Sequence, residues 1–189
     1  MENSIDGWVK KQANHYKTVE NQHEPLREEN IIKLLKKLEN VKTITEVACA
    51  GGFLTKRLQD MGYSIIGLDL PEVVAKAKTT FPDCNFKNFN AEMDNINEAD
   101  VIVAAEIVEH LANDFSFLMR CAVAKHIIIT IPNNPTIESG DHHIRYYPRF
   151  SMEKLLDLAG FEVVEYLVDS SSQFFLGKKR SSPVVNENI

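Results

Sequence analysis

One short stretch, Thr43–Gly62, restricts most strongly how this chain can fold. It opens with a β-branched run, Ile44–Val47, that is typical of a buried strand. Five small residues, Ala48–Gly52, follow directly, and Leu54 and Leu58 then recur at helical spacing. A strand, a small-residue turn and a helix in this order bring backbone N–H groups and a helix N-terminus close to a ligand. The turn is therefore predicted to approach a ligand closely.

A second strand, Ser64–Asp69, comes next and ends in a carboxylate. In a doubly wound sheet, an acid at the tip of the second strand can accept hydrogen bonds from both hydroxyls of a ribose. We therefore expect Asp69 to contact a ribose.

Two motifs in this region, Glu46-Val-Ala-Cys-Ala-Gly-Gly52 and Gly67-Leu-Asp69, resemble the first two motifs of class I S-adenosylmethionine-dependent methyltransferases. Members of that family usually carry glycine where this chain has Ala48 and Ala50. Because an alanine disfavours positive φ, we expect both alanines to keep negative φ while the two glycines after them absorb the tight turn.

Length and composition indicate one globular domain. The chain has 189 residues, of which 25% are charged and 44% hydrophobic. It has no apolar run of membrane-spanning length and no signal-peptide pattern, so we expect a cytoplasmic protein without a membrane partner. The formal net charge of -6 disfavours a nucleic acid partner. Three scattered cysteines have no metal-ligand spacing and are predicted to be reduced packing residues: Cys49, Cys84 and Cys121.

The rest of the chain alternates between strands and helices. Further strands are predicted at residues 84–89, 99–105, 126–131, 161–168 and 173–177. Helices are predicted at residues 25–38, 71–78, 115–121 (with Phe115 buried) and 152–159, the last capped by Ser151. This order indicates an α/β fold: a doubly wound, seven-stranded, mostly parallel sheet with an antiparallel C-terminal hairpin and helices on both faces. The methyltransferase resemblance implies the same core.

Three regions follow from these predictions. Residues 1–40 form N-terminal helices that flank or cover the cofactor site, residues 41–178 form the methyltransferase core, and residues 179–189 form a flexible tail. Tyr16 is a candidate cofactor contact in the first region. Alternatively, Trp8 and Tyr16 dock a helix on the core.

The resemblance implies S-adenosylmethionine as cofactor, with S-adenosylhomocysteine as product. The turn N–H groups serve the carboxylate of its methionine end, two backbone carbonyls and an acid serve the ammonium, and the adenosine lies beside the second and third strands. The implied cofactor-binding residues are Tyr16, Glu46, Ala48, Ala50, Gly51, Gly52, Asp69, Leu70, Asn90, Ala91 and Ala105.

Candidates on the acceptor side follow the fourth and fifth strands, where open α/β sheets place their ligands. A histidine there can take a proton from an oxygen or nitrogen nucleophile. Arg145 can hold an acceptor carboxylate or phosphate. Alternatively, His143 and Arg145 tie the long loop to the sheet edge. The candidate catalytic residues are Glu109, His110, His142, His143, Arg145 and Tyr146.

Glu106, Glu109 and His110 also have the i, i+3, i+4 spacing that places three ligands on one helical face. With His142 they resemble the metal set of small-RNA 2′-O-methyltransferases and the corresponding motif of ubiquinone-pathway O-methyltransferases. Many relatives carry the segment without a metal, so we expect no obligatory metal. The motif of DNA amino-methyltransferases is absent after the fourth strand, which argues against that class.

The leading hypothesis is a methyltransferase that acts on an oxygen or nitrogen atom of a small metabolite or natural-product intermediate. Methylation of a peptide or RNA terminus, metal-assisted in the RNA case, is a second hypothesis. A non-catalytic protein that binds S-adenosylmethionine is a third. A small-molecule acceptor is the expected partner, and a homodimer is compatible with these predictions.

Overall fold

The computed structural model describes residues 23–133 and 143–181. Within them, seven strands form a single sheet in the order β3-β2-β1-β4-β5-β7-β6. The strands are β1 (Thr43–Val47), β2 (Ser64–Asp69), β3 (Phe86–Asn88), β4 (Val101–Ala105), β5 (His126–Pro132), β6 (Phe161–Val168) and β7 (Ser172–Lys179). The first five are parallel, and β7 is antiparallel to both β5 and β6. The predicted fold class is confirmed.

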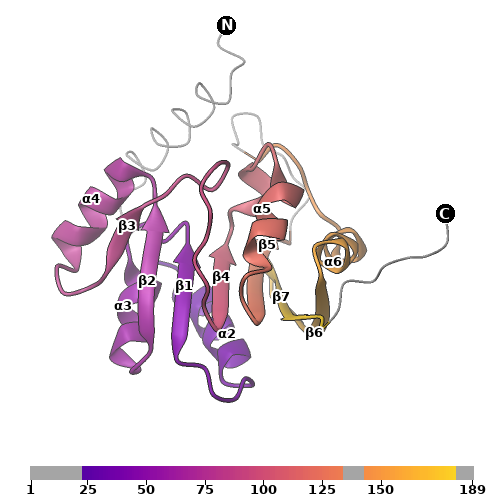
Figure 1. Cartoon of the computed structure of the whole chain (residues 1–189), viewed down its shortest axis with the longest axis horizontal. Coiled ribbons are helices and arrows are strands. Elements are labelled where there is room, and N and C mark those ends of the chain that lie inside the picture. Colours follow the sequence, from indigo (N-terminus) through magenta and orange to yellow (C-terminus); the bar gives the residue numbers. More distant parts are fainter. Residues whose placement is uncertain (1–22, 134–142, 182–189) are drawn as a thin grey trace, which may run out of the picture.

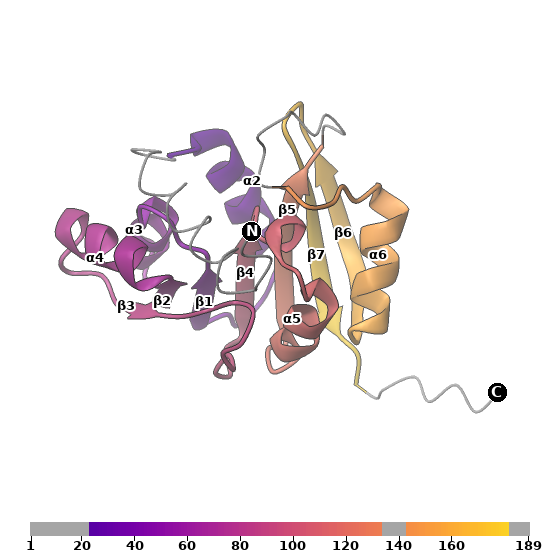
Figure 2. The same cartoon turned by 90° about the horizontal axis from the view of Figure 1, so that it is seen from above.

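Helices cover both faces of this sheet (Figures 1 and 2). They are α2 (Pro25–Leu35), α3 (Phe53–Asp60), α4 (Pro71–Thr80), the 3-10 helix η1 (Val108–His110), α5 (Asp114–Cys121) and α6 (Arg149–Leu158). Leucines and isoleucines of α2 and α3 pack with one face of the sheet in one apolar cluster. Residues of α5 and α6, including Phe117 and Met152, pack against the other face. Since both faces are covered, most residues of the central strands β1, β4 and β5 are buried.

The three cysteines are free and buried, in agreement with packing roles. Cys49 and Cys84 lie in a small cluster with α4, and Cys121 lies in the core beside α5.

The structure corrects several predicted details. Helix α6 begins at Arg149 after Pro148, and Ser151 is inside the helix rather than at its cap. Proline explains the earlier start, because its fixed φ suits a helix entry. Phe115 is 41% exposed, so the buried side of α5 begins at Phe117. The third strand is reduced to Phe86–Asn88.

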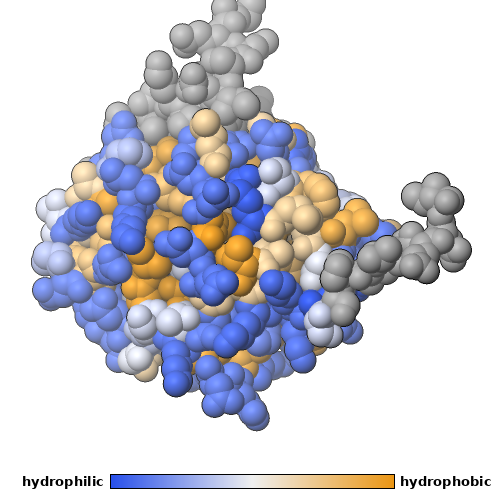
Figure 3. Space-filling view, in the orientation of Figure 1, coloured by the Kyte–Doolittle hydropathy of each residue, from blue (hydrophilic) through white to orange (hydrophobic). Residues whose placement is uncertain are grey.

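The connection from β3 to β4 contains no helix. A pocket therefore opens on this face of the sheet, lined by Thr45, Ile66, Leu68, Lys87, Asn88, Phe89, Asp94, Asn95 and Asn97. Figure 3 shows apolar side chains at the surface there, over β1 and β2. The lining residues come from β1, β2 and β3 and from the connection after β3.

Candidate functional site

Asp69 and the turn after β1 meet at the carboxyl edge of the parallel strands. The Asp69 carboxylate accepts hydrogen bonds from the backbone N–H groups of Ala50, at 2.9 Å, and Leu70, at 2.7 Å. Burial raises the pKa of Asp69 to about 6, and the two N–H donors partly oppose this rise. Asp69, the acid predicted at the end of the second strand, therefore holds the turn in place. Its two carboxylate oxygens have further lone pairs that can accept hydrogen bonds from a ligand.

The turn has a conformation that contradicts the expectation for its alanines. Ala48 has φ 60° and Ala50 has φ 47°, and Gly52 follows at φ 80°. The prediction of negative φ is wrong, because the two glycines after the alanines do not form the tight turn alone. The N–H of Ala50 donates to Asp69 from this left-handed backbone. Left-handed residues that alternate with others form the concave N–H arrays that bind anions. Both alanines therefore adopt a strained backbone conformation in this turn.

Ala50→Gly is expected to raise the free energy of unfolding by about 0.5–1 kcal/mol. Relief of a left-handed alanine contributes about 1–2 kcal/mol, and the extra freedom of glycine in the unfolded chain offsets about 0.4–1 kcal/mol. Denaturant unfolding measures the difference. Ala75→Gly, at an exposed position of α4, is the matched control and should lower stability by about 1 kcal/mol. Equal destabilisation by both changes would contradict the strain.

A pocket beside this turn brings together residues of α2, β1, the turn, α3 and the end of β4. Its lining residues are Glu24, Arg27, Glu28, Ile31, Glu46, Ala48, Cys49, Ala50, Gly51, Phe53, Leu54, Ala105 and Glu106. Five predicted cofactor residues thus line one pocket: Glu46, Ala48, Ala50, Gly51 and Ala105. Gly52 is next to it at the N-cap of α3. Tyr16 lies outside the described residues.

Sequence reasoning missed several residues of this pocket. Arg27 is the one arginine or lysine among its described lining residues, and its Nε lies 3.8 Å from a carboxylate oxygen of Glu106. That Nε is buried without a hydrogen-bond partner among the described residues. A guanidinium there is suited to a ligand carboxylate. Arg27 has no signal in the sequence, because it lies off the apolar stripe of α2 and in no recognised motif.

Phe53 and Glu106 were also missed as pocket residues. The Phe53 ring stacks on His23 at 4.7 Å between centroids and meets Phe81 edge-on at 5.1 Å. Glu106 has φ 51° and bonds the Thr130 hydroxyl at 2.9 Å. Burial raises the pKa of Glu106, and the Arg27 charge opposes the rise.

The residues assigned to adenosine lie near the end of β3. The Asn90 side-chain oxygen accepts the N–H of Glu92 at 3.0 Å, and its backbone N–H donates to Asp94 at 2.8 Å. Asn90 therefore shapes the turn after β3. Ala91 packs against the apolar core, and Leu70 precedes the first turn of α4. Their contact with adenosine stays a prediction.

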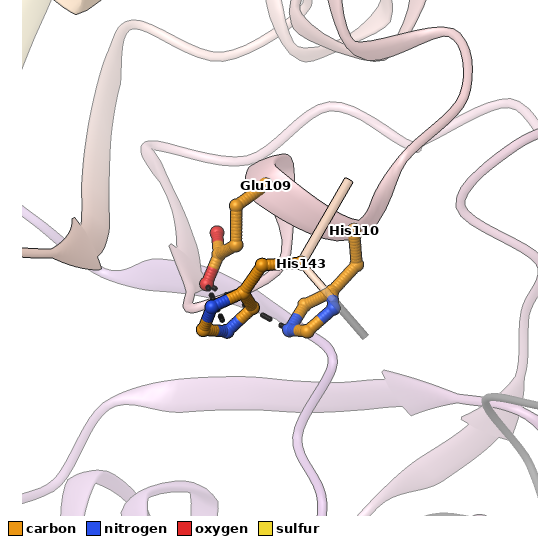
Figure 4. Close-up of side chains that lie close together, drawn as sticks. All are labelled: Glu109, His110 and His143. Carbon is orange, nitrogen blue, oxygen red and sulfur yellow. Dashed lines mark ion pairs between the residues drawn. The ribbon is translucent and has the colours of Figure 1, made fainter. Parts of the chain in front are cut away.

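Three residues on the acceptor side gather into one cluster: Glu109, His110 and His143 (Figure 4). Glu109 Oε1 lies 3.8 Å from His110 Nε2 and 3.9 Å from His143 Nε2. The two imidazole rings are 4.6 Å apart between centroids. The Ile144 N–H donates to the Glu109 carbonyl at 3.0 Å, which fastens the segment after β5 beside η1. His142 lies outside the described residues.

Arg145 is engaged with the protein itself. Its guanidinium donates to the Leu111 carbonyl at 2.9 Å and lies 2.7 Å from an Asp114 carboxylate oxygen. The Tyr147 hydroxyl bonds the same carboxylate. These contacts favour the alternative in which Arg145 ties its loop to the sheet edge. Tyr146 is partly buried, and its catalytic role stays a prediction.

The chemistry of the cluster suits a divalent cation, although its geometry differs from the predicted set. The ligand atoms of Glu109, His110 and His143 all lie within 4.8 Å of one another. One carboxylate and two imidazoles are ordinary ligands of such ions. The expectation of three ligands on one helical face is wrong, because η1 comprises only Val108–His110 and Glu106 precedes it with positive φ.

Comparison with known proteins identifies the family of this chain. A family model described as a methyltransferase domain matches residues 19–166. The chain belongs to this family, the class I S-adenosylmethionine-dependent methyltransferases. A probable S-adenosylmethionine-dependent methyltransferase of Mycolicibacterium smegmatis is 26% identical over 139 residues, which cover 67% of this chain and 54% of the relative.

Two further relatives carry the name ubiquinone biosynthesis O-methyltransferase. The one from Aliivibrio fischeri is 29% identical over 123 residues, covering 58% of this chain and 53% of the relative. The human mitochondrial one is 36% identical over 85 residues, which cover 45% of this chain and 22% of the relative. This methyltransferase domain thus spans about half or less of the length of these curated relatives.

Solved structures share the fold across nearly the whole chain. A putative methyltransferase from a Haloferax volcanii complex with the activator Trm112 has a TM-score of 0.72 and 16% identity, covering 95% of this chain and 99% of that one. A magnesium protoporphyrin IX methyltransferase from Synechocystis with bound S-adenosylhomocysteine has a TM-score of 0.68 and 13% identity, covering 94% and 96%. In the described part of the chain, no helix is both long and apolar enough to cross a bilayer.

Proposed function

We propose that this methyltransferase domain binds S-adenosylmethionine at the carboxyl edge of its sheet and methylates an oxygen or nitrogen atom of a small molecule. The observation that carries the proposal is that the turn after β1, the Asp69 carboxylate and the pocket beside this turn meet at the carboxyl edge of the sheet. This pocket, which α2 also lines, is called the pocket under α2 or the cofactor pocket below. S-adenosylmethionine supplies an electrophilic methyl group on a sulfonium. The protein contributes groups that bind the cofactor and the acceptor, align them and exclude water.

The residues of the pocket fit the methionine end of this cofactor. Arg27 and the N–H groups of the turn suit its carboxylate. The carbonyls of Ala48 and Ala105, with the carboxyl group of Glu46, suit its ammonium. Asp69 holds the ribose. Since α2 supplies three lining residues of this pocket and its N-cap Glu24 a fourth, the contact of this helix with the site supports our proposal that residues 1–40 flank the cofactor.

The Glu109–His110–His143 cluster is the proposed place of the acceptor. The side chain of His143 is 26% exposed and that of Glu109 is 1% exposed, so His143 is the member open to an incoming molecule. Its imidazole takes the proton of the acceptor oxygen or nitrogen, and the nearby carboxylate stabilises the resulting imidazolium. The names of the ubiquinone-pathway relatives support an oxygen acceptor and a small molecule.

The experiment that tests this function uses the full chain with S-adenosylmethionine carrying a deuterated methyl group. Pools of phenols, catechols, carboxylic acids and amines are incubated separately from short peptides and RNA 3′ ends, and mass spectrometry detects the labelled product. We expect a labelled small molecule. Product from the peptide or RNA pool alone would favour the second hypothesis. Binding of S-adenosylhomocysteine without product from any pool would favour the non-catalytic one.

A cytoplasmic location and a homodimer stay proposals. The predicted tail at residues 179–189 begins too early, because Lys179 is the last residue of β7 and the Arg180 N–H donates to the Gly160 carbonyl at 3.0 Å. Residues 182–189 of that tail lie outside the described residues. The cation site is the alternative to direct proton transfer at the cluster. If a cation is bound there, Glu109, His110 and His143 would hold it, and it would polarise the acceptor oxygen.

A further inference from the structure

Glu46 is a buried carboxyl group at the base of the cofactor pocket. It points from β1 into the pocket lining and is only 4% exposed. The Thr55 hydroxyl, from the first turns of α3, hydrogen-bonds its carboxylate, and the backbone N–H of Thr55 also contributes. Thr55 itself is completely buried. One residue of α3 therefore fixes the position of this acid.

Gly67 has no side chain and therefore leaves room for the contact between Glu46 and Thr55. It is the residue of β2 directly opposite Glu46 in the parallel register. A Cβ atom on Gly67 would lie 2.7 Å from the Thr55 hydroxyl oxygen and 2.6 Å from a Phe86 ring carbon. A side chain at this position would therefore force the hydroxyl away from Glu46.

The groups facing Glu46 are mostly acidic. Glu28 of α2 and Asp69 of β2 disfavour its charge, and the same pocket is lined by Glu24, Glu106 and the Cys49 thiol. The nearby cations are Arg27, which lines the pocket, and Arg57, which lies 3.3 Å from Glu28. The His23 imidazole lies 3.4 Å from Glu28. Burial is the largest effect and raises the pKa of Glu46 to about 8, against the lowering effect of Thr55. Without a ligand, Glu46 is therefore mainly protonated at neutral pH.

We propose that Thr55 and Gly67 are positioning residues that fix the Glu46 carboxyl group toward the pocket, where it is a neutral acid in the empty site and the anionic partner of the cofactor ammonium in the filled site. The neutral carboxyl group and the ammonium become a carboxylate–ammonium pair, and one proton passes to the buffer. Cofactor binding is thereby coupled to proton release. This inference rests on the proposed function, since it requires the methionine end in this pocket.

The coupling is measured by calorimetry of S-adenosylhomocysteine binding at pH 7 in phosphate and in Tris, whose ionisation enthalpies differ. A pKa of about 8 predicts release of about 0.9 proton per ligand, falling to about 0.1 at pH 9. 5′-Methylthioadenosine, which lacks the amino acid end, is the matched ligand and should bind without releasing a proton.

Variants separate the positioning role from a general loss of structure. Glu46→Gln should abolish proton release. Thr55→Val removes the hydroxyl and should move the midpoint pH of proton release upward by about one unit, while Thr55→Ser restores it. Thr45→Val, at a buried threonine of the same strand that does not line the cofactor pocket, should leave the midpoint unchanged.

The two proposals fail in distinguishable ways. Binding of S-adenosylhomocysteine with equal heats in both buffers would overturn the proton coupling and leave the proposed function intact. An unchanged midpoint in Thr55→Val would remove Thr55 from the positioning role. Absence of S-adenosylhomocysteine binding to the unchanged chain would overturn the proposed function itself.

Discussion

Replacement of His143 by alanine is expected to lower turnover by about 100-fold or more, the usual contribution of a positioned general base. Affinity for S-adenosylhomocysteine should be unchanged, because the imidazole belongs to the cluster with Glu109 and does not line the pocket under α2. Turnover is measured with saturating cofactor and the acceptor found in the pool experiment. A loss in kcat at constant cofactor affinity places the role of His143 at the acceptor.

His126→Ala is the matched control for this change. His126 begins β5 at the opposite end of the strand, so its loss should leave turnover near that of the unchanged chain. Equal loss in both variants would indicate a structural effect. If a chelator abolishes turnover of the unchanged chain and a divalent cation restores it, His143 is a metal ligand and the assignment as a general base that acts without a metal is wrong.

The fold was predictable from the sequence because its signals are local and mutually consistent. The apolar run of β4 and the acid that ends β2 gave strands whose bounds agree with the structure within two residues. Predictions were wrong where one residue depends on tertiary contacts. Phe115 satisfies the helical period of α5 yet is exposed, since the buried side begins only at Phe117.

The candidate site was predictable in its placement and less so in its conformation. Motif spacing located Asp69 at the end of the second strand, and the structure shows in addition that its carboxylate bonds the turn. Left-handed φ at Ala50 could not be read from the sequence, because alanine normally avoids it and the bond to Asp69 is a tertiary contact. Arg27 was missed for a related reason: α2 docks beside the turn, and nothing in its own sequence indicates that.

Asp69→Ala is expected to weaken binding of S-adenosylhomocysteine by about 1–3 kcal/mol, which corresponds to about 5-fold to 150-fold in Kd. The carboxylate lies at the end of β2 and accepts the N–H of Ala50, so its removal loosens the turn and also removes the proposed ribose contact. Isothermal calorimetry measures the affinity, and thermal unfolding of the same samples measures the loss of stability.

Asp100→Ala is the control that separates these two effects. Asp100 also accepts two backbone N–H groups, those of Lys42 and Thr43, both at 2.9 Å, but it lies just before β4 at the opposite edge of the sheet. Its loss should lower stability without changing the affinity for S-adenosylhomocysteine. Unchanged affinity in Asp69→Ala would remove Asp69 from the site. Equal weakening in both variants would show that affinity follows stability, so that the ribose contact would have to be reassigned.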